Sequence, residues 1–283
     1  MPAPVKILIL GASYGSLLAS KLMFGGHELT LVCLPAEADL INAEGFRVRM
    51  PIRGRAQPVE IDSRKLPGKV RAAGPDAVDP NDFDLVGLAM QEPQYRSPGV
   101  RELLDKVARS RKPCMSIMNM PPPPYIKRIP GLDHDALKAA YTDWSVWENF
   151  DPGCLTLCSP DPQAIRPPDC KANELLVTLP TNFKAARFDD EKSTAILRQI
   201  EKDIEAARFE LVSRFAPPST QPARKRVSWL AAVDMNAPKQ RLAAVAVMRQ
   251  FIVPIGFDAA LCASRIIDHQ PPAPAQLPLA STS

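Results

Sequence analysis

The chain has few histidines and no cysteine arrangement that would hold a metal. Of its 283 residues only three are histidines, and none of the six cysteines forms a C-x-x-C pair or precedes a histidine at zinc spacing. We therefore expect no metal site. Cys33 and Cys114 lie inside apolar runs, as small buried hydrophobic residues do. This cysteine usage is typical of a reducing compartment, so we expect a cytoplasmic protein.

Long apolar runs and a strong charge of either sign are also missing. No stretch approaches the ~18 apolar residues of a membrane span, and the apolar run at residues 7–10 is too short for a signal peptide. The 35 basic and 31 acidic residues leave a net charge of +4, and the densest basic run, at residues 224–226, is too short for a nucleic-acid footprint. We expect a small-molecule substrate and neither a membrane nor a nucleic-acid partner.

Proline, by contrast, is abundant and unevenly placed. The 31 prolines include a run of four at residues 121–124, and residues 270–283 are rich in Pro, Ala and Ser. A segment of that composition cannot bury enough apolar surface to fold. We predict a disordered tail over residues 270–283.

Strands and helices alternate in the first half of the chain. The predicted strands are residues 5–10, 28–34, 83–89 and 114–118, and the predicted helices are residues 15–24, 36–44 and 98–111. Two short β-like stretches fall within residues 46–61, and residues 67–82 are predicted to form a loop rich in Pro, Gly and Asp. Repeated β–α units predict an α/β fold, a Rossmann-like doubly wound parallel sheet.

The second half is predicted to be β-like and then helical. Residues 137–179 contain β-like stretches, which are residues 139–147, 154–157 and 175–179. Residues 189–209 form a strong helix with apolar residues repeating every four positions. We predict a dinucleotide-binding-fold domain over residues 1–215 and a small helical C-terminal domain over residues 216–269. A homodimer through the helical region is expected, because that region is too small to bury its apolar faces alone.

The turn after the first strand carries the most information. It reads Gly11-Ala12-Ser13-Tyr14-Gly15, which is one residue short of G-x-G-x-x-G and has serine where the middle glycine belongs. That glycine lets the backbone approach a pyrophosphate, so the Ser13 and Tyr14 side chains are expected to intrude there. The same residues spell G-x-S-x-G, the strand-to-helix elbow of some serine hydrolases. Ser13 is therefore either a turn residue or a nucleophile.

The order of segments resembles one family, the ketopantoate reductases (2-dehydropantoate 2-reductases). The similar stretches are residues 9–19, 26–32, 40–48, 84–89, 116–119, 151–153 and 189–209. The resemblance covers roughly the first 210 residues and is weak afterwards. It implies a Rossmann fold and the NADPH-dependent reduction of an α-keto acid, with lysines and asparagines at the site.

The resemblance also assigns a nucleotide-binding role to several positions. It implies that the glycine turn, Leu34 and Gln91 contact the cofactor. The family's second strand ends in an arginine that binds the 2′-phosphate of NADP, whereas this chain has the uncharged Cys33-Leu34-Pro35. The acidic alternative for NAD is Glu37. The cofactor is accordingly NADP or NAD, or none.

The family's catalytic positions are only partly retained. Gln91 stands where the family has a lysine, and Asn119 keeps the asparagine at a strand end. The helix comparable to the family's catalytic helix, residues 227–235, has no lysine. Lys239 is then the nearest candidate for the acid that protonates the substrate oxygen.

Three interpretations of the function stay open. The first is an NAD(P)-dependent oxidoreductase that reduces a small carbonyl compound or 2-oxo acid. The second is a cofactor-independent hydrolase or acid–base enzyme using Ser13, His134 and Glu148; His134 has carboxylates on either side and is predicted on a loop, and Glu148 follows Trp147. The third is a binding or regulatory protein without catalysis. The resemblance favours the reductase.

Overall fold

The computed structural model describes residues 3–51, 57–118, 120–129, 131–158, 164–178 and 185–215. Within them, a six-stranded parallel sheet has the order β5-β2-β1-β6-β7-β8. Its strands are β1 (Lys6–Leu10), β2 (Glu28–Val32), β5 (Lys69–Ala73), β6 (Leu85–Leu88), β7 (Cys114–Ser116) and β8 (Leu155–Leu157). A second, four-stranded sheet comprises β3 (Arg47–Met50), β4 (Val59–Asp62), β9 (Ala164–Ile165) and β10 (Glu174–Val177), in the order β4-β3-β10-β9.

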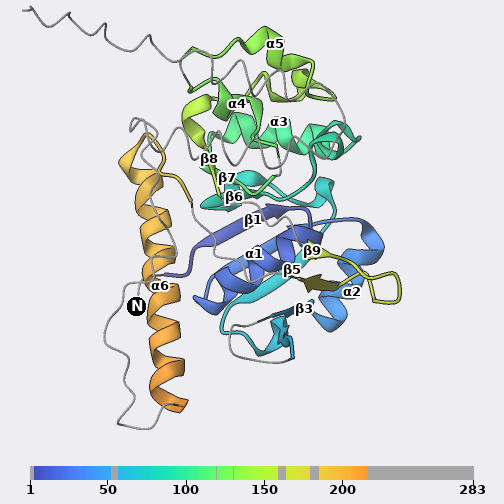
Figure 1. The fold of residues 1–283 in the computed structure, drawn as a ribbon, viewed down its shortest axis with the longest axis vertical. Coiled ribbons are helices and arrows are strands. Elements are labelled where there is room, and N and C mark those ends of the chain that lie inside the picture. The colour runs from blue at the N-terminus through green and yellow to red at the C-terminus, as the bar shows by residue number, and fades with distance from the viewer. Residues whose placement is uncertain are drawn as a thin grey trace, which may run out of the picture.

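The helices surround the larger sheet, as Figure 1 shows. They are α1 (Ser13–Phe24), α2 (Pro35–Glu44), α3 (Val100–Ser110), α4 (Pro123–Ile126), α5 (His134–Lys138) and α6 (Glu191–Phe215). Short 3₁₀ helices join these elements, among them η4 (Glu92–Arg96) and η5 (Trp144–Trp147).

The strand order confirms the predicted Rossmann-like sheet. From β1 the chain builds outward through β2 and β5, and then returns to the other side of β1 to add β6, β7 and β8. This is the 3-2-1-4-5-6 order of dinucleotide-binding folds. The direction reverses between β1 and β6, and ligands of such sheets bind outside the carboxyl ends of the strands at that reversal.

Both faces of the large sheet are covered, which explains the unbroken apolar run of β1. Ile7 and Ile9 belong to one hydrophobic cluster, and Leu8 and Leu10 belong to the other. All four are fully buried. Because side chains alternate across a strand, a strand covered on both faces needs an apolar residue at every position.

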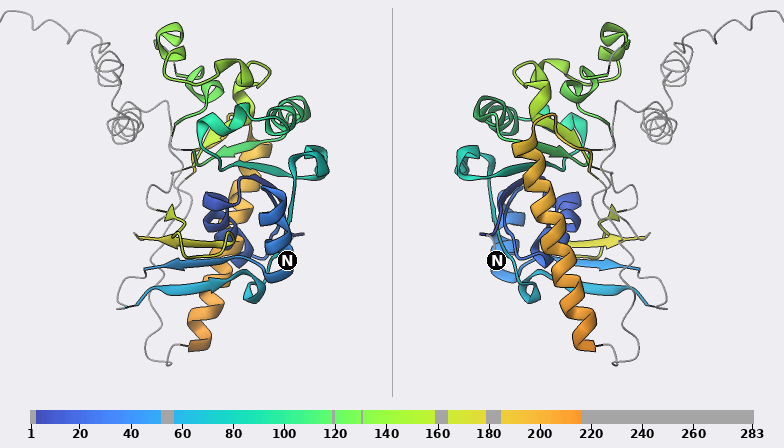
Figure 2. Two further views of the ribbon diagram at one scale, coloured as in Figure 1. Left: turned by 90° about the vertical axis from the view of Figure 1, so that its right-hand side faces the viewer. Right: turned by 90° about the vertical axis from the view of Figure 1, so that its left-hand side faces the viewer.

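Helix α1 lies between the larger sheet and the smaller one. It contacts β3, β10 and the long helix α6, which runs along the left-hand side in Figure 1 and across the front in the right-hand view of Figure 2. Among the described side chains of α6, the buried apolar ones are Leu197, Ile200 and Ile204, so the apolar spacing seen in the sequence does mark its packed face. The two sheets therefore share one core through α1.

The predicted loop at residues 67–82 was wrong in part, because it contains strand β5. This strand pairs with β2 in parallel, from Lys69 opposite Glu28 to Ala73 opposite Val32. It is an edge strand with Lys69 and Arg71 exposed, and the adjacent prolines and glycines are typical of loops. Those features concealed it in the sequence.

The β-like stretch predicted at residues 139–147 was also wrong, and so was the loop position of His134. The structure has helix α5, which begins at His134, followed by 3₁₀ helix η5. Aspartates accept hydrogen bonds from the first backbone N–H groups of each, Asp133 at α5 and Asp143 at η5. Capping of this kind outweighed the β-propensity of the aromatic residues between them. The predicted helical domain at residues 216–269 and the tail after it lie outside the described residues.

Candidate functional site

The turn between β1 and α1 lies at the point where the strand order reverses. Gly11 has φ = 104° and donates its backbone N–H to the Val32 carbonyl of β2 at 2.9 Å. A Cβ on Gly11 would lie 2.8 Å from the Ala89 carbonyl oxygen, directly after β6. Positive φ and this close approach both require glycine. The turn is thus fixed by the ends of β1, β2 and β6 together.

Gly15 has a different reason to be glycine. It lies within α1, where an added Cβ would come within 2.8 Å of the Ile9 Cγ2 of β1. Its absence lets the helix pack closely on the strand, which is the role of the third glycine in the dinucleotide fingerprint. The five-residue turn therefore keeps the tight turn and the close helix–strand packing that two of the three glycines give the longer motif.

The N-terminus of α1 has the properties of an anion site. Its N-cap is Ala12, no side chain caps it, and the first turn contains no acidic residue. The first backbone N–H groups of a helix have no partner within the helix, and they form its positive end. Ser13 and Tyr14 lie there half-buried, and the Tyr14 side chain packs against the hydrophobic core. These residues fit a pyrophosphate group.

The end of β2 carries an ion pair that the sequence did not predict. Glu37, in the first turn of α2, pairs with Arg166, which follows β9 of the second sheet. Beside them, burial and the Glu37 carboxylate raise the pKa of the Cys33 thiol to about 12, so this cysteine stays protonated. Leu34 is 74% exposed. Arg166 is 129 positions from Glu37, and no local signal connects the two.

Gln91 lies after β6, at the same edge of the sheet. It is exposed, and its backbone N–H donates to the Gln94 side chain at 2.8 Å as 3₁₀ helix η4 begins. The next residue, Glu92, is buried, and its carboxylate accepts hydrogen bonds from the Thr142 backbone N–H and hydroxyl, the latter at 2.6 Å. Gln91 is therefore the group of this pair that faces solvent.

Ser13 does not have the geometry of a hydrolase nucleophile. In an elbow of that kind the serine lies on a sharp, strained turn. Here Ser13 is the first residue of α1, and among the described residues the one non-glycine with positive φ is Arg111. The positive φ of this turn is at Gly11, which adopts it without a steric penalty.

His134 and Glu148 are not assembled with Ser13. Helix α5 lies at one end of the molecule in Figure 1, beyond α3 and α4, whereas α1 lies beside β1. The carboxylates flanking His134 are engaged elsewhere: Asp133 caps α5, and Asp135 pairs with Lys138 at 2.8 Å. Glu148 is exposed, although the adjacent Trp147 is fully buried. Asn119 and Lys239 lie outside the described residues.

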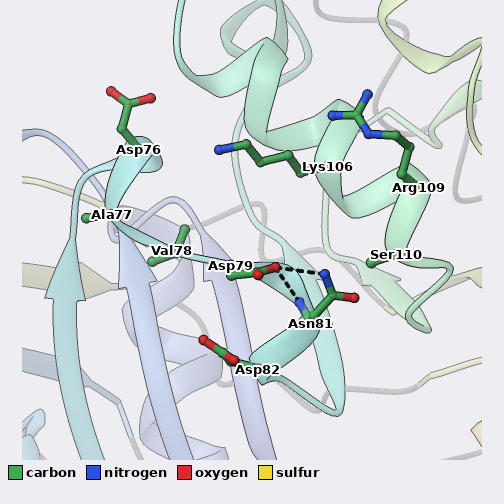
Figure 3. Close-up of a pocket in the computed structure, with 9 residues that line it drawn as sticks. All are labelled: Asp76, Ala77, Val78, Asp79, Asn81, Asp82, Lys106, Arg109 and Ser110. Atoms are coloured by element: carbon green, nitrogen blue, oxygen red, sulfur yellow. Dashed lines mark hydrogen bonds between the residues drawn. The ribbon is translucent and has the colours of Figure 1, made fainter.

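An open hollow of about 680 Å³ lies beside the segment that joins β5 to β6. Figure 3 shows it between the segment that leads into β6 and the C-terminal half of α3. Its lining is polar, and Asp79 accepts two hydrogen bonds from Asn81, each at 2.9 Å. The lining segment runs from the carboxyl end of β5 to the start of β6, so the hollow lies outside the reversal point between β1 and β6.

The described residues form neither a metal-binding group nor a membrane-spanning helix. No group of three or more His, Cys, Asp or Glu side chains there is arranged to hold a metal ion. Across the same part of the chain, no helix combines the length and the apolar character needed to cross a membrane.

Comparison with known proteins gives a likeness of fold. No family model matches the chain, and no curated protein matches it by sequence. A structure named as a ketopantoate reductase, from Ralstonia solanacearum MolK2, matches 93% of this chain and 82% of its own with a TM-score of 0.51 at 15% identity. At this identity the likeness shows the fold alone. The resemblance predicted from the sequence is thus confirmed at the level of the fold.

Two further structures named as 2-dehydropantoate 2-reductases match less closely. The one from Bacillus subtilis has a TM-score of 0.44 at 18% identity, over 69% of this chain. The chain spans 54% of that protein's length. The one from Enterococcus faecalis has a TM-score of 0.47 at 14% identity, over 94% of this chain and 80% of its own.

Proposed function

We propose that this protein is a nicotinamide-dependent oxidoreductase that reduces a small carbonyl compound, such as a 2-oxo acid. One observation carries the proposal: the Gly11 turn and the uncapped N-terminus of α1 lie at the reversal point of a sheet with the Rossmann strand order. The likeness of fold to the Ralstonia ketopantoate reductase supports the same assignment.

The local chemistry supports a dinucleotide at this edge of the sheet. The free N–H groups of the first turn of α1 would bind the pyrophosphate, and Gly11 leaves space for it next to the Ala89 carbonyl. A nicotinamide cofactor supplies a hydride to a carbonyl carbon. The chain itself must then orient the substrate and provide the proton for its oxygen.

Three residues of this chain are assigned to the substrate. Gln91, exposed after β6, offers an amide that can donate to a carbonyl or carboxylate oxygen. Asn119 would do the same from the segment after β7. Lys239 is the proposed acid. The buried Glu92 accepts hydrogen bonds from Thr142, so we assign it to holding η4 in place, not to the reaction.

Titration of the full chain with NADPH and NADH tests this function. Calorimetry or nicotinamide fluorescence is expected to give micromolar binding of at least one cofactor, followed by oxidation of that cofactor with a 2-oxo acid from a small panel. No binding at millimolar cofactor would overturn the proposal. Binding without turnover on any carbonyl compound would favour the regulatory interpretation.

A charge-insertion pair makes the test specific for α1. Ser13→Glu places a carboxylate at a helix N-terminus, which favours the helix but repels a pyrophosphate. We expect the affinity for the cofactor to fall at least tenfold, which corresponds to about 1.4 kcal/mol of binding free energy. Thermal stability should be kept. Ser193→Glu adds the same charge to the first turn of α6 and should leave binding unchanged.

The hydrolase interpretation has a direct readout in the same preparation. Ester hydrolysis that needs no cofactor and disappears in Ser13→Ala would contradict the reductase assignment. We expect no such hydrolysis, because Ser13 occupies an unstrained helical position and no described histidine is bonded to it.

A further inference from the structure

The ion pair between Glu37 and Arg166, here called the strand-end pair, joins two segments that are distant in sequence. Glu37 belongs to α2, which follows β2 of the Rossmann sheet, and Arg166 follows β9 of the second sheet. Among the described residues two large hydrophobic side chains are exposed, Leu34 at 74% and Ile165 at 52%. Leu34 lies just before α2, and Ile165 immediately precedes Arg166. Apolar surface and a cation thus occur together at the end of β2.

We propose that Arg166 binds the 2′-phosphate of an NADP-type cofactor, with Glu37 holding the guanidinium at the end of β2 and Leu34 contacting the adenine. This inference rests on the proposed function. It makes the second sheet a determinant of cofactor choice, because the chain has no cation of its own at residues 33–35.

The pairing of Glu37 disfavours the alternative cofactor. In NAD-binding folds a carboxylate near the end of the second strand accepts hydrogen bonds from the ribose hydroxyls. Here the Glu37 side chain is 13% exposed, and its carboxylate already accepts from Arg166. Among the residues described, the ion pair with Arg166 leaves the second carboxylate oxygen free but makes Glu37 a weaker acceptor for ribose hydroxyls than an unpaired carboxylate would be.

The Arg166 guanidinium has enough donors to bind the Glu37 carboxylate and a phosphate at the same time. A guanidinium has five N–H donors in a planar fork. Within the described part of the chain, the one hydrogen bond of this side chain is from Nη2 to Glu37, and the side chain is 34% exposed. The remaining donors are available to a phosphate, which carries about −1.5 to −2 charges near pH 7 and prefers such a partner.

Binding measurements on Arg166→Gln test the inference without any assay of turnover. For the full chain we expect NADPH to bind at least tenfold more tightly than NADH. In Arg166→Gln the affinity for NADPH should fall at least tenfold, while that for NADH should not fall, because Glu37 is then released from its pair. Adenosine 2′,5′-bisphosphate and ADP, as probes without nicotinamide, should show the same contrast.

A matched variant controls for the loss of an arginine from the second sheet. Arg49 is exposed on β3 and pairs with Glu60 at 3.1 Å, so Arg49→Gln removes an ion-paired arginine of that sheet and should leave both affinities unchanged. Equal loss of NADPH and NADH binding in Arg166→Gln would show a structural role and overturn the inference. Preference of the wild-type chain for NADH would also overturn it, with the proposed function intact. Failure to bind either cofactor would overturn both.

Discussion

Gly11 is constrained by its conformation and by its surroundings at the same time. Its φ of 104° is unfavourable for any residue with a Cβ, and the space where that atom would lie is occupied by the Ala89 carbonyl. Gly26, at the end of α1, has φ = 85° but open space around its missing Cβ. Substitution at Gly26 therefore tests the cost of positive φ alone, and substitution at Gly11 tests that cost together with steric overlap.

Alanine at each of these positions should reveal both costs. Gly26→Ala is expected to lower the free energy of unfolding by about 1–2 kcal/mol, the cost of a left-handed conformation for a residue with a Cβ. Gly11→Ala should lose that amount and about 1–3 kcal/mol more, because the backbone of the residues after β6 must move. Urea denaturation followed by circular dichroism measures both. Equal losses would show that the turn has room the structure does not indicate.

At the scale of elements, the edge strand β5 depends on one side chain of α2. The Asn42 amide donates to the Ala72 carbonyl and accepts from the Ala72 N–H, each at 2.8 Å. It therefore forms the pair of hydrogen bonds that another strand would form at this edge. Edge strands left unpaired are prone to pair with other chains. Asn42 both anchors α2 and protects β5.

Removal of this amide should destabilise the protein measurably. Asn42→Ala loses two hydrogen bonds, each contributing about 0.5–1.5 kcal/mol, and we expect the free energy of unfolding to fall by about 1–2 kcal/mol because the site is partly exposed. Asn149→Ala is the control, since it removes one exposed hydrogen bond to Asp105 and should cost less than half as much. Chemical denaturation of the three proteins decides the matter, and no difference between the variants would refute the role of Asn42.

At the scale of the whole molecule, His27 connects the sheet to α6. Its Nδ1 accepts from the Val5 N–H at 3.3 Å, and its Nε2 lies 3.9 Å from the Asp203 carboxylate. The ring is 1% exposed. Burial lowers the pKa of His27, and the nearby Asp203 opposes that shift only in part. The folded protein therefore favours the neutral imidazole, with Nδ1 as acceptor.

This histidine predicts a loss of stability on mild acidification. A folded-state pKa below the unfolded value of about 6.5 means that the unfolded chain binds the proton first. The contribution of His27 is thus complete above about pH 6.5 and declines as the pH falls toward the folded-state pKa. We expect a lower free energy of unfolding at pH 5.5 than at pH 7.5, with a smaller difference in His27→Gln. His134→Gln, which changes a partly exposed histidine, should keep the full difference; if it does not, the pH dependence arises elsewhere.

The sequence by itself determined the features that have local causes. The unbroken apolar run of β1, the positive φ of Gly11 and the amphipathic pattern of α3 are fixed by side-chain periodicity and by allowed backbone angles. These were sufficient to predict the Rossmann-like sheet and to locate the turn at its centre. Gly11 and Gly15 were located in the same way, whereas Gln91 came from the resemblance to the ketopantoate reductases.

The tertiary structure alone decided which distant segments meet. Arg166 reaches Glu37 because the second sheet packs on α1, and β5 is a strand because β2 offers it a partner. His134 lies apart from Ser13 for a similar reason, since α5 lies beyond α3 and α4 at one end of the molecule, whereas α1 lies beside β1 (Figure 1). Hydrogen-bond and ion-pair partners more than a hundred residues apart depend on how elements pack, and local periodicity carries no information about that.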